Sequence, residues 1–243
     1  MSKVASTNVP KLLTTAYFPP VSYFAAMAEE MTGLARRRDG DSPMELSPSV
    51  VYIEACENYQ KQSYRNRCRF YAADGVQALT FPVVHEGGTH KLPISRIKVD
   101  YSTPWLVQHQ RAIVSAYRTS AYFEYYQDEL FAIMDSRPEK LIDLNTALMK
   151  FFIEKTGLRV DLRMTQEYSP EAVADGIECE DLREAIHPKR PNNILSDLAI
   201  EKPYFQVFAP KYGFKSDLSI MDLLFNEGPD SILYLKPPTK SQQ

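Results

Sequence analysis

The stretch Lys11-Leu12-Leu13-Thr14-Thr15-Ala16-Tyr17-Phe18 decides the fold that we expect for this chain. It has the apolar content and the length of a buried strand, and Pro19-Pro20 ends it before a helix predicted from Tyr23 to about Met31. Beyond an exposed loop over 33–48, the apolar run Val50–Ala55 predicts a second strand. Strand, helix and strand in this order open an α/β unit with a parallel strand pair, so we expect an α/β fold.

The segment that follows predicts an antiparallel hairpin region. Asp74-Gly75 is a hairpin signal between strands expected at Arg67–Tyr71 and Val76–Val84. After another turn, Ile94–Val99 is expected to return as a further strand. We therefore expect these strands to extend the sheet that the opening unit begins.

Three helices are predicted for the middle of the chain. The first has Pro104 at its first helical position, with Ser102 or Thr103 as its cap. The second runs over Tyr122–Met134, and the third begins between Ser136 and Pro138 and ends at Gly157. Trp105, His109, Ile113 and Tyr117 recur every four residues, so they lie on one face of the first helix.

The last third of the chain alternates between polar segments and short apolar ones. Between Thr165 and Asn193 we expect short helices and a long loop that is either functional or mobile. Strands are expected at Tyr204–Phe208 and Ile232–Leu235. Between them, Ser219 and Asp222 have the spacing of a capping box at the start of a helix.

Taken together, these elements predict one α/β domain over 1–243 with a single mixed sheet and with tails at 1–10 and 236–243. A chain of 243 residues is long enough to bury a sizeable core. Its apolar stretches are shorter than the about 20 residues of a membrane span. Because the N-terminus also lacks the apolar core of a secretory signal, we expect a cytoplasmic protein.

The composition excludes several classes of function. A net charge of −3 argues against general nucleic-acid binding, which needs a basic surface across the domain. The cysteines, Cys56, Cys68 and Cys179, are odd in number and lack a C-x-x-C spacing. They predict neither a disulfide framework nor a zinc ribbon. The sequence indicates no particular cofactor and no oligomeric state.

Four cations lie among aromatic residues in the segment Tyr59–Phe70. If 64–70 is a strand, Arg65, Arg67 and Arg69 share one face and Asn66 lies on the other. Such a face is either a solvated edge strand or a site for an anion, which guanidinium groups bind as planar forks.

A second basic cluster, His187-Pro188-Lys189-Arg190, is expected on a loop. It is either a solvated loop or a binding surface. Two basic clusters in an acidic chain would suit an anionic small molecule if the fold brings them together.

The sequence contains few candidate catalytic residues, since it has no nucleophile motif and no glycine-rich phosphate loop. His109 is either a general base or a structural histidine, and Trp105 is either a core residue or a platform for a sugar ring. Asn145 interrupts an apolar helix, where it either bridges helices or contacts a ligand. His85 and His90 have no evident third partner, so we expect an ordinary cross-strand pair and no metal site.

The order of these motifs resembles the WbqC-like family of bacteria. The resemblance begins at Tyr17-Phe18-Pro19-Pro20-Val21-Ser22-Tyr23-Phe24 and continues through Lys61, Asn66-Arg67 and Phe81-Pro82-Val83. It then includes Trp105, His109, Tyr117, Ala121-Tyr122-Phe123, Leu144-Asn145, Ser219-Ile220-Met221-Asp222-Leu223-Leu224 and Gly228-Pro229. The chain departs from the family at Glu54-Ala55-Cys56-Glu57, where many members carry an Asp-Asp pair, and at Thr14-Thr15, where members commonly carry Gln-Pro.

The resemblance implies a cytosolic step in surface-polysaccharide or O-antigen biosynthesis. A transferase acting on a nucleotide-linked amino sugar, by acyl or aminoacyl transfer, would suit that setting; the alternative is a non-catalytic binding or scaffold protein. The candidate general base is His109. The candidate substrate-binding residues are Lys61, Asn66, Arg67, Trp105, Tyr117, Tyr122, Asn145, His187 and Lys189.

Overall fold

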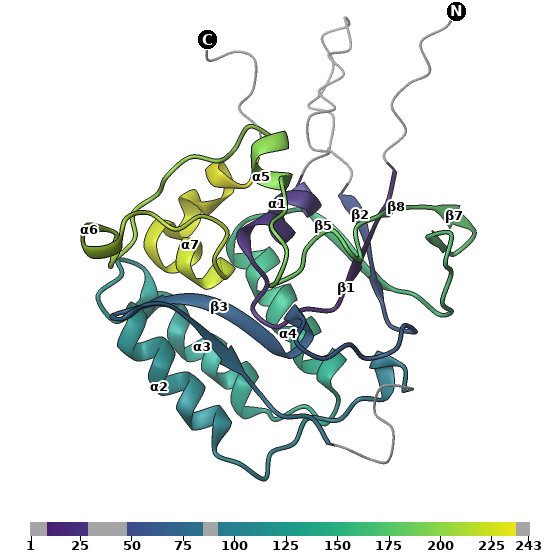
Figure 1. Ribbon diagram of the computed structural model, residues 1–243, viewed down its shortest axis with the longest axis horizontal. Coiled ribbons are helices and arrows are strands. Elements are labelled where there is room, and N and C mark those ends of the chain that lie inside the picture. Colours follow the sequence, from purple (N-terminus) through teal and green to yellow (C-terminus); the bar gives the residue numbers. More distant parts are fainter. Residues whose placement is uncertain (1–8, 29–47, 85–91, 237–243) are drawn as a thin grey trace, which may run out of the picture.

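The computed structural model describes residues 9–28, 48–84 and 92–236 of the chain. Several sequence-based expectations lie outside these residues: the end of the first helix near Met31, most of the loop at 33–48, the pair His85 and His90, and most of both tails. Figure 1 shows the arrangement of the described elements.

A parallel sheet of four strands forms one side of the molecule. Strand β1 (Lys11–Thr14) lies between β2 (Ser49–Glu54) and β8 (Glu180–Asp181), and β5 (Val160–Met164) pairs with the outer edge of β2. All three pairings are parallel, with Leu13 opposite Ile53 in the central pair. The predicted α/β class and the predicted parallel opening are therefore confirmed.

The expected single mixed sheet is not what forms. Strands β3 (Arg67–Ala72) and β4 (Gly75–Thr80) make a separate antiparallel hairpin, and β6 (Val173–Ala174) pairs only with β7 (Ile177–Glu178). Because both edges of β1 and of β2 are already occupied in the parallel sheet, the hairpin has no central edge to join. It packs against the helices instead.

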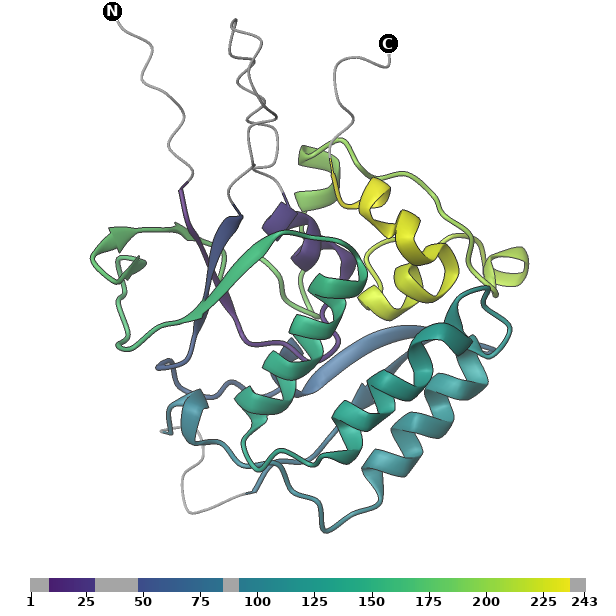
Figure 2. The ribbon, with the colours of Figure 1, turned by 180° about the vertical axis from the view of Figure 1, so that it is seen from behind.

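The helical middle forms much as the sequence predicts, as α2 (Trp105–Tyr117), α3 (Phe123–Asp135) and α4 (Leu141–Lys155). Figures 1 and 2 show α4 crossing the molecule between the parallel sheet on one side and the hairpin with α2 and α3 on the other. This central position explains the apolar stripe of α4, which includes Leu144 and Leu148, both with no exposed surface.

The ends of these helices differ in detail from the expectation. Pro104 is the residue before α2, with no side-chain cap, and α4 begins at Leu141, after the predicted 136–138. Gly157 has φ +72°, a left-handed conformation that glycine adopts without steric cost, and it follows the end of α4 as predicted.

Helix α7 (Ile220–Glu227) lies beside the buried α1 (Val21–Ala28). The Ser219 hydroxyl caps α7 by accepting from the backbone N–H of Met221, as the sequence predicts. Asp222 is not the reciprocal partner, because the Ser219 N–H donates instead to the carbonyl of Arg69 in the hairpin.

Three expected strands are absent from the described residues. Of Ile232–Leu235, all residues but the last lie in a 3₁₀ helix, η5 (Gly228–Tyr234), and Leu235 follows its end. Tyr204–Phe208 is an irregular segment before α6 (Ala209–Tyr212). Within 94–99 the chain forms η4 (Ile94–Arg96) and then two isolated bridges, from Lys98 to Lys140 and from Val99 to Val83. A strand cannot continue there because the backbone is bonded to the start of α4: the Val99 N–H donates to Glu139, and the Ile97 carbonyl accepts from Leu141.

The region 165–193 holds the short strands β6, β7 and β8 instead of the expected short helices. The first helix after it is α5 (Ile194–Asp197). Strand β8 pairs with β1 through only two residues, yet it brings Arg183 to the sheet.

Candidate functional site

The parallel strands of the sheet end at one edge, and this edge gathers the ionisable side chains described below. Glu54 ends β2, Thr165 follows β5, and Arg183 follows β8. The strand order places β2 and β8 on opposite sides of β1, and ligands of open α/β sheets bind at the carboxyl ends of strands where the order changes direction. We therefore expect a ligand site at this edge of the sheet.

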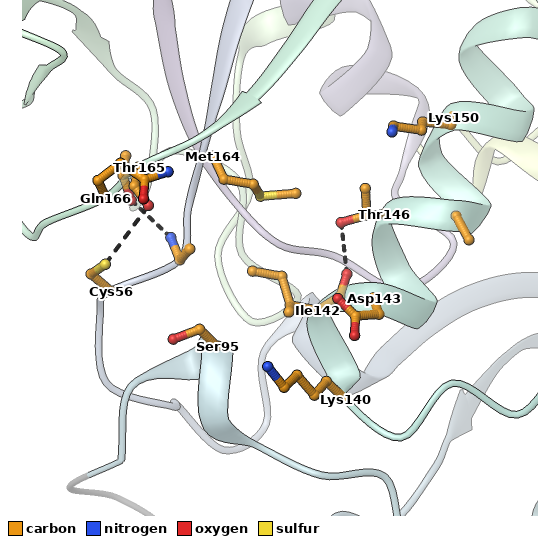
Figure 3. A pocket seen from close by; sticks show the side chains of 12 residues that line it. Cys56, Ser95, Lys140, Ile142, Asp143, Thr146, Lys150, Met164, Thr165 and Gln166 are labelled. Carbon is orange, nitrogen blue, oxygen red and sulfur yellow. Dashed lines mark hydrogen bonds between the residues drawn. The ribbon is translucent and has the colours of Figure 1, made fainter.

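Two cavities adjoin at this edge. Cavity A, of about 610 Å³, lies between the ends of β2 and β5 and the helix α4, and Figure 3 shows its lining. Cavity B, of about 600 Å³, lies between the segment after β2 and the segments around β8. Cys56 lines both cavities, so the two are neighbours.

Glu54 is a buried carboxylate that holds the three strand ends together. Its Oε1 accepts hydrogen bonds from the Thr165 hydroxyl at 2.7 Å and the Cys56 backbone N–H at 2.9 Å. Its Oε2 accepts from Nη1 of Arg183 at 3.1 Å. With no exposed surface and both oxygens bonded, Glu54 positions the wall between the cavities and does not face a ligand.

Arg183 is the cation that pairs with Glu54 at this edge. Its Nε and Nη2 donate to the two oxygens of Asp181 at 2.9 and 2.7 Å, and its Nη1 also donates to the carbonyl of Ser169 at 2.9 Å. The guanidinium lies 5.2 Å from the ring centre of Tyr168. Tyr168 is 53% exposed and lines cavity B, so one aromatic ring is open to a ligand there.

Glu57 is the carboxylate that is available for chemistry. Nε and Nη2 of Arg65 both donate to its Oε1, at 2.9 and 2.6 Å. None of the residues that the structure describes donates to Oε2, although Glu57 lines cavity B. Burial raises the pKa of this carboxyl, and the Arg65 guanidinium opposes that rise. A carboxylate with a raised pKa and a free oxygen in a cavity is suited to accept a proton.

Cys56 is the half-buried cysteine between the cavities, whereas Cys68 and Cys179 are buried. Burial and the nearby Glu54 carboxylate raise the pKa of the Cys56 thiol. The side chain is therefore a neutral thiol near neutral pH and forms part of the wall.

Cavity A has a different lining. One face of α4 contributes Asp143, Thr146 and Lys150, and Lys140 precedes the same helix. In Figure 3 the side chains of Lys140 and Lys150 lie far apart along α4, with Asp143 and Thr146 between them and Met164 on the side of the strands.

The structure places His109 and Trp105 in the core, outside the lining of both cavities. His109 is 4% exposed, and its Nδ1 bonds the Tyr17 hydroxyl at 2.9 Å. Burial lowers the pKa of this imidazole to about 4, so it is neutral near pH 7. Trp105 stacks on Phe81 and donates its Nε1–H to the Asp100 carbonyl at 2.9 Å. These contacts are those of packing residues.

The arginine segment divides in a way that strand alternation did not predict. Tyr64–Asn66 forms a 3₁₀ helix, η2, which turns Arg65 inward, and only Arg67 and Arg69 keep the expected outward face. The Asn66 side chain donates to the carbonyl of Phe81 at 2.7 Å and is buried. Arg67 donates to the Thr80 hydroxyl at 3.1 Å on the hairpin. Neither residue lines cavity A or cavity B.

Three other candidates lie in helix contacts. Asn145 is fully buried and donates to the Arg65 carbonyl at 2.8 Å and the Thr15 hydroxyl at 3.2 Å. It therefore connects α4 to the backbone of Arg65, the residue that binds Glu57. Tyr117 is buried against Phe225. Tyr122 lies against Gly228, where an added Cβ would stand 2.5 Å from its ring.

The two basic clusters do meet in space. The Lys189 Nζ donates to Oε1 of Gln62, next to the exposed Lys61. His187 accepts from the Lys189 backbone N–H at 3.2 Å. The neighbouring Gln60 and Glu184 line cavity B, so Lys61, His187, Lys189 and Arg190 form a basic rim beside that cavity.

The segment Pro19–Tyr23 follows the first strand, where ligands of α/β sheets bind, but it lines neither cavity. It is buried and pairs with the start of α7, with Pro20 bridged to Ser219.

Sequence reasoning missed Glu57, Arg183 and the strands β5 and β8 as parts of the site. The alternation of Val160, Leu162 and Met164 with polar residues was a signal for β5. For Arg183, whose partner Glu54 lies 129 residues away, the sequence holds no comparable signal.

Two features are absent from the part of the chain that the structure describes. Within residues 9–28, 48–84 and 92–236, no helix is long and apolar enough to cross a bilayer. In the same residues, nowhere do three or more His, Cys, Asp or Glu side chains converge as they would to hold a metal ion.

Comparison with known proteins gives the class of the chain. The model of the WbqC-like protein family matches residues 46–234, and the chain belongs to this family. It is also similar to the uncharacterised protein Rv1507c of Mycobacterium tuberculosis, with 27% identity over 207 residues. That match covers 77% of this chain and 87% of the mycobacterial protein. No solved structure matches the chain significantly.

Proposed function

We propose that this WbqC-like protein is a transferase that acylates the amino group of a nucleotide-linked amino sugar, with cavity B as the acceptor site. The observation that carries the proposal is Glu57, whose Oε1 is fixed by Arg65 while its Oε2 is left without a donor among the described residues. The mechanism therefore assigns the general base to Glu57 in place of His109, which lines neither cavity.

The charges around cavity B support an acceptor of this kind. Its lining includes the carboxylates of Glu57, Asp181 and Glu184 and one guanidinium, that of Arg183. Each of these carboxylates is paired with an arginine, and the Glu57 Oε2, to which none of the described residues donates, suits an amino group. The basic rim of Lys61, His187, Lys189 and Arg190 lies beside it and suits the diphosphate of the same molecule. The open ring of Tyr168 offers a surface for the sugar.

The transfer step follows from this placement. The neutral amine of the acceptor attacks the carbonyl carbon of an activated acyl group, and a C–N bond forms. The bond from that carbon to the leaving group breaks, and its electron pair goes to the leaving group. The proton on the nitrogen passes to the Glu57 carboxylate. A raised pKa makes Glu57 a better base than an ordinary glutamate.

The test is a product assay with purified protein, a panel of amino-sugar nucleotides, and acyl and aminoacyl donors, followed by mass spectrometry. General base catalysis contributes about 10²- to 10⁴-fold, so Glu57→Gln should lower turnover by that factor. Glu124→Gln, on the exposed face of α3, is the matched control and should leave turnover unchanged.

The pH profile sharpens this test. Because the pKa of Glu57 is raised, activity should fall on acidification at a pH above the usual range of a glutamate, and this limb should vanish in Glu57→Gln. Absence of product from every donor and acceptor pair, with a partner protein bound, would instead favour the scaffold alternative.

A further inference from the structure

We propose that cavity A is the donor site and that it takes an acyl group activated by a phosphate-bearing leaving group. This inference rests on the proposed function, because it assigns the second substrate of the same reaction. Four observations carry it: the free lysines, the apolar floor, the contrast with cavity B, and the shared wall.

Two lysines give cavity A its charge. Neither Lys140 nor Lys150 forms an ion pair with a described residue, and both are exposed. They differ by ten positions, which corresponds to about 15 Å along an α-helix. Asp143 lies between them on the same face. The cavity therefore attracts an elongated anion, with a cation near each end.

The floor of cavity A has an apolar part. Ile142, Ala147 and Met164 line it, and Figure 3 shows Ile142 close to Lys140 and Met164 on the side of the strands. A ligand of inorganic phosphate alone would leave this surface uncovered. An organic leaving group, with an apolar body and a phosphate, covers it and reaches a lysine.

The contrast between the cavities assigns the two substrates. Cavity A is lined by two lysines and one aspartate, whereas cavity B is lined by three carboxylates and one arginine. The lysines of cavity A have no ion-pair partner among the described residues, whereas each carboxylate of cavity B is paired with an arginine and only the Glu57 Oε2 of that pairing lacks a donor among those residues. An anionic donor is therefore favoured in cavity A, and an amine beside Glu57 in cavity B.

The shared wall lets the reacting groups meet. Cys56 lines both cavities and its backbone N–H is bonded to Glu54, so the wall between them is fixed. In the transfer, the acyl carbonyl carbon lies at this junction. The acceptor nitrogen reaches it from cavity B, and the leaving group departs with the bonding electrons into cavity A.

The experiment is calorimetric binding of two probes to the full chain: AMP, the leaving group of an acyl adenylate, and pantetheine 4′-phosphate, the phosphate-bearing part of a carrier thioester. We expect one of them to bind, and its identity distinguishes the two sources of the acyl group. The double variant Lys140→Gln/Lys150→Gln keeps the apolar stems and should raise the Kd at least tenfold. The control Arg111→Gln, on the exposed face of α2, should leave the Kd unchanged.

Protection of Cys56 gives a second readout. Iodoacetamide should alkylate Cys56 and spare the buried Cys68 and Cys179, and the bound probe should slow that reaction at least fivefold. The reaction is run at a pH above 9, because the pKa of the Cys56 thiol is raised.

The outcomes separate this inference from the proposed function. If neither probe binds, or if the lysine variant binds as tightly as the wild type, the donor site is misplaced. The acylation of amino sugars would still stand if Glu57→Gln alone removes turnover. If the lysines are needed for probe binding but no acyl product forms with any acceptor, the proposed function fails and cavity A remains an anion site.

Discussion

Two regions of this protein bury ionisable side chains, and they do so in opposite ways. At the carboxyl edge of the parallel sheet, Glu54 and Glu57 are each bonded to an arginine and lie next to open cavities. On the helical side, His109 and Asp222 are buried without any ion pair among the described residues.

The two regions differ in the protonation state that they favour for a buried group. A paired carboxylate stays charged, whereas burial alone favours the neutral form. Burial lowers the pKa of His109 to about 4 and raises that of Asp222 to about 6. Of these two regions, the sheet edge is therefore the one that holds charges in place beside space for a ligand, which is what catalysis by charge and proton transfer needs.

The largest effect is expected where an ion pair at the sheet edge is broken. Arg65→Met leaves Glu57 buried without its partner, and loss of one member of a buried pair costs about 3 to 5 kcal/mol. Denaturant unfolding near pH 7 measures the loss. The double variant Arg65→Met/Glu57→Leu should recover most of it. A loss below about 1 kcal/mol in the single variant would show that the pair is solvated.

A gain in stability is expected from the helical side. Tyr204 and Gln206 both donate to Oδ2 of Asp222, so Asp222→Asn can keep these bonds through its single oxygen. The side-chain NH₂ of the new asparagine can also donate a hydrogen bond to the Tyr117 hydroxyl, which has no hydrogen-bond partner among the described residues. The variant removes a buried carboxyl that is charged at pH 7.

The size of this gain in stability and its dependence on pH follow from the pKa of Asp222. Since folding raises the pKa of Asp222 from its usual 3.8 to about 6, the folded state binds this proton more tightly, and stability is lost as pH rises between those values. The shift corresponds to roughly 3 kcal/mol above pH 6. Thermal unfolding at pH 4 and pH 7 should show a gain for Asp222→Asn only at the higher pH. Equal gains at both would mean that the carboxyl is not charged in the fold.

The smallest effect is expected at His109. His109→Gln loses the hydrogen bond to the Tyr17 hydroxyl in the core, at a cost of about 1 to 3 kcal/mol. Specific activity of the folded protein should be unchanged, because the imidazole lines neither cavity. A 10²-fold or greater fall in turnover, with an unchanged melting temperature, would return the general base to His109.

The parts of the fold that local patterns predict are those that depend on near neighbours. The opening strand, the hairpin at Asp74-Gly75 and the three helices follow from periodicity and turn residues over short stretches. The strands expected at 94–99 and 204–208 fail because their backbone or side chains bond to distant segments, as Val99 does to Glu139 and Tyr204 to Asp222.

The candidate site was harder to predict, for the same reason. The basic clusters at Lys61 and Lys189 were found by composition, and they do lie together beside cavity B. Strand alternation would place Arg65 on one face with Arg67 and Arg69, and nothing local signals the 3₁₀ turn that points it at Glu57. The motif residues shared with the family, such as Trp105 and His109, proved to be core residues in this structure.

The short strand β8 has a consequence for how the site assembles. It joins the sheet through two residue pairs, with Lys11 opposite Glu180, across a separation of 169 residues. Closing so long a loop costs conformational entropy. The contacts that offset this cost can form only after β1 and β2 are in place. Cavity B should therefore form last during folding and open first in local unfolding, so the amide of Leu182 should exchange with deuterium faster than those within the central pair β1 and β2.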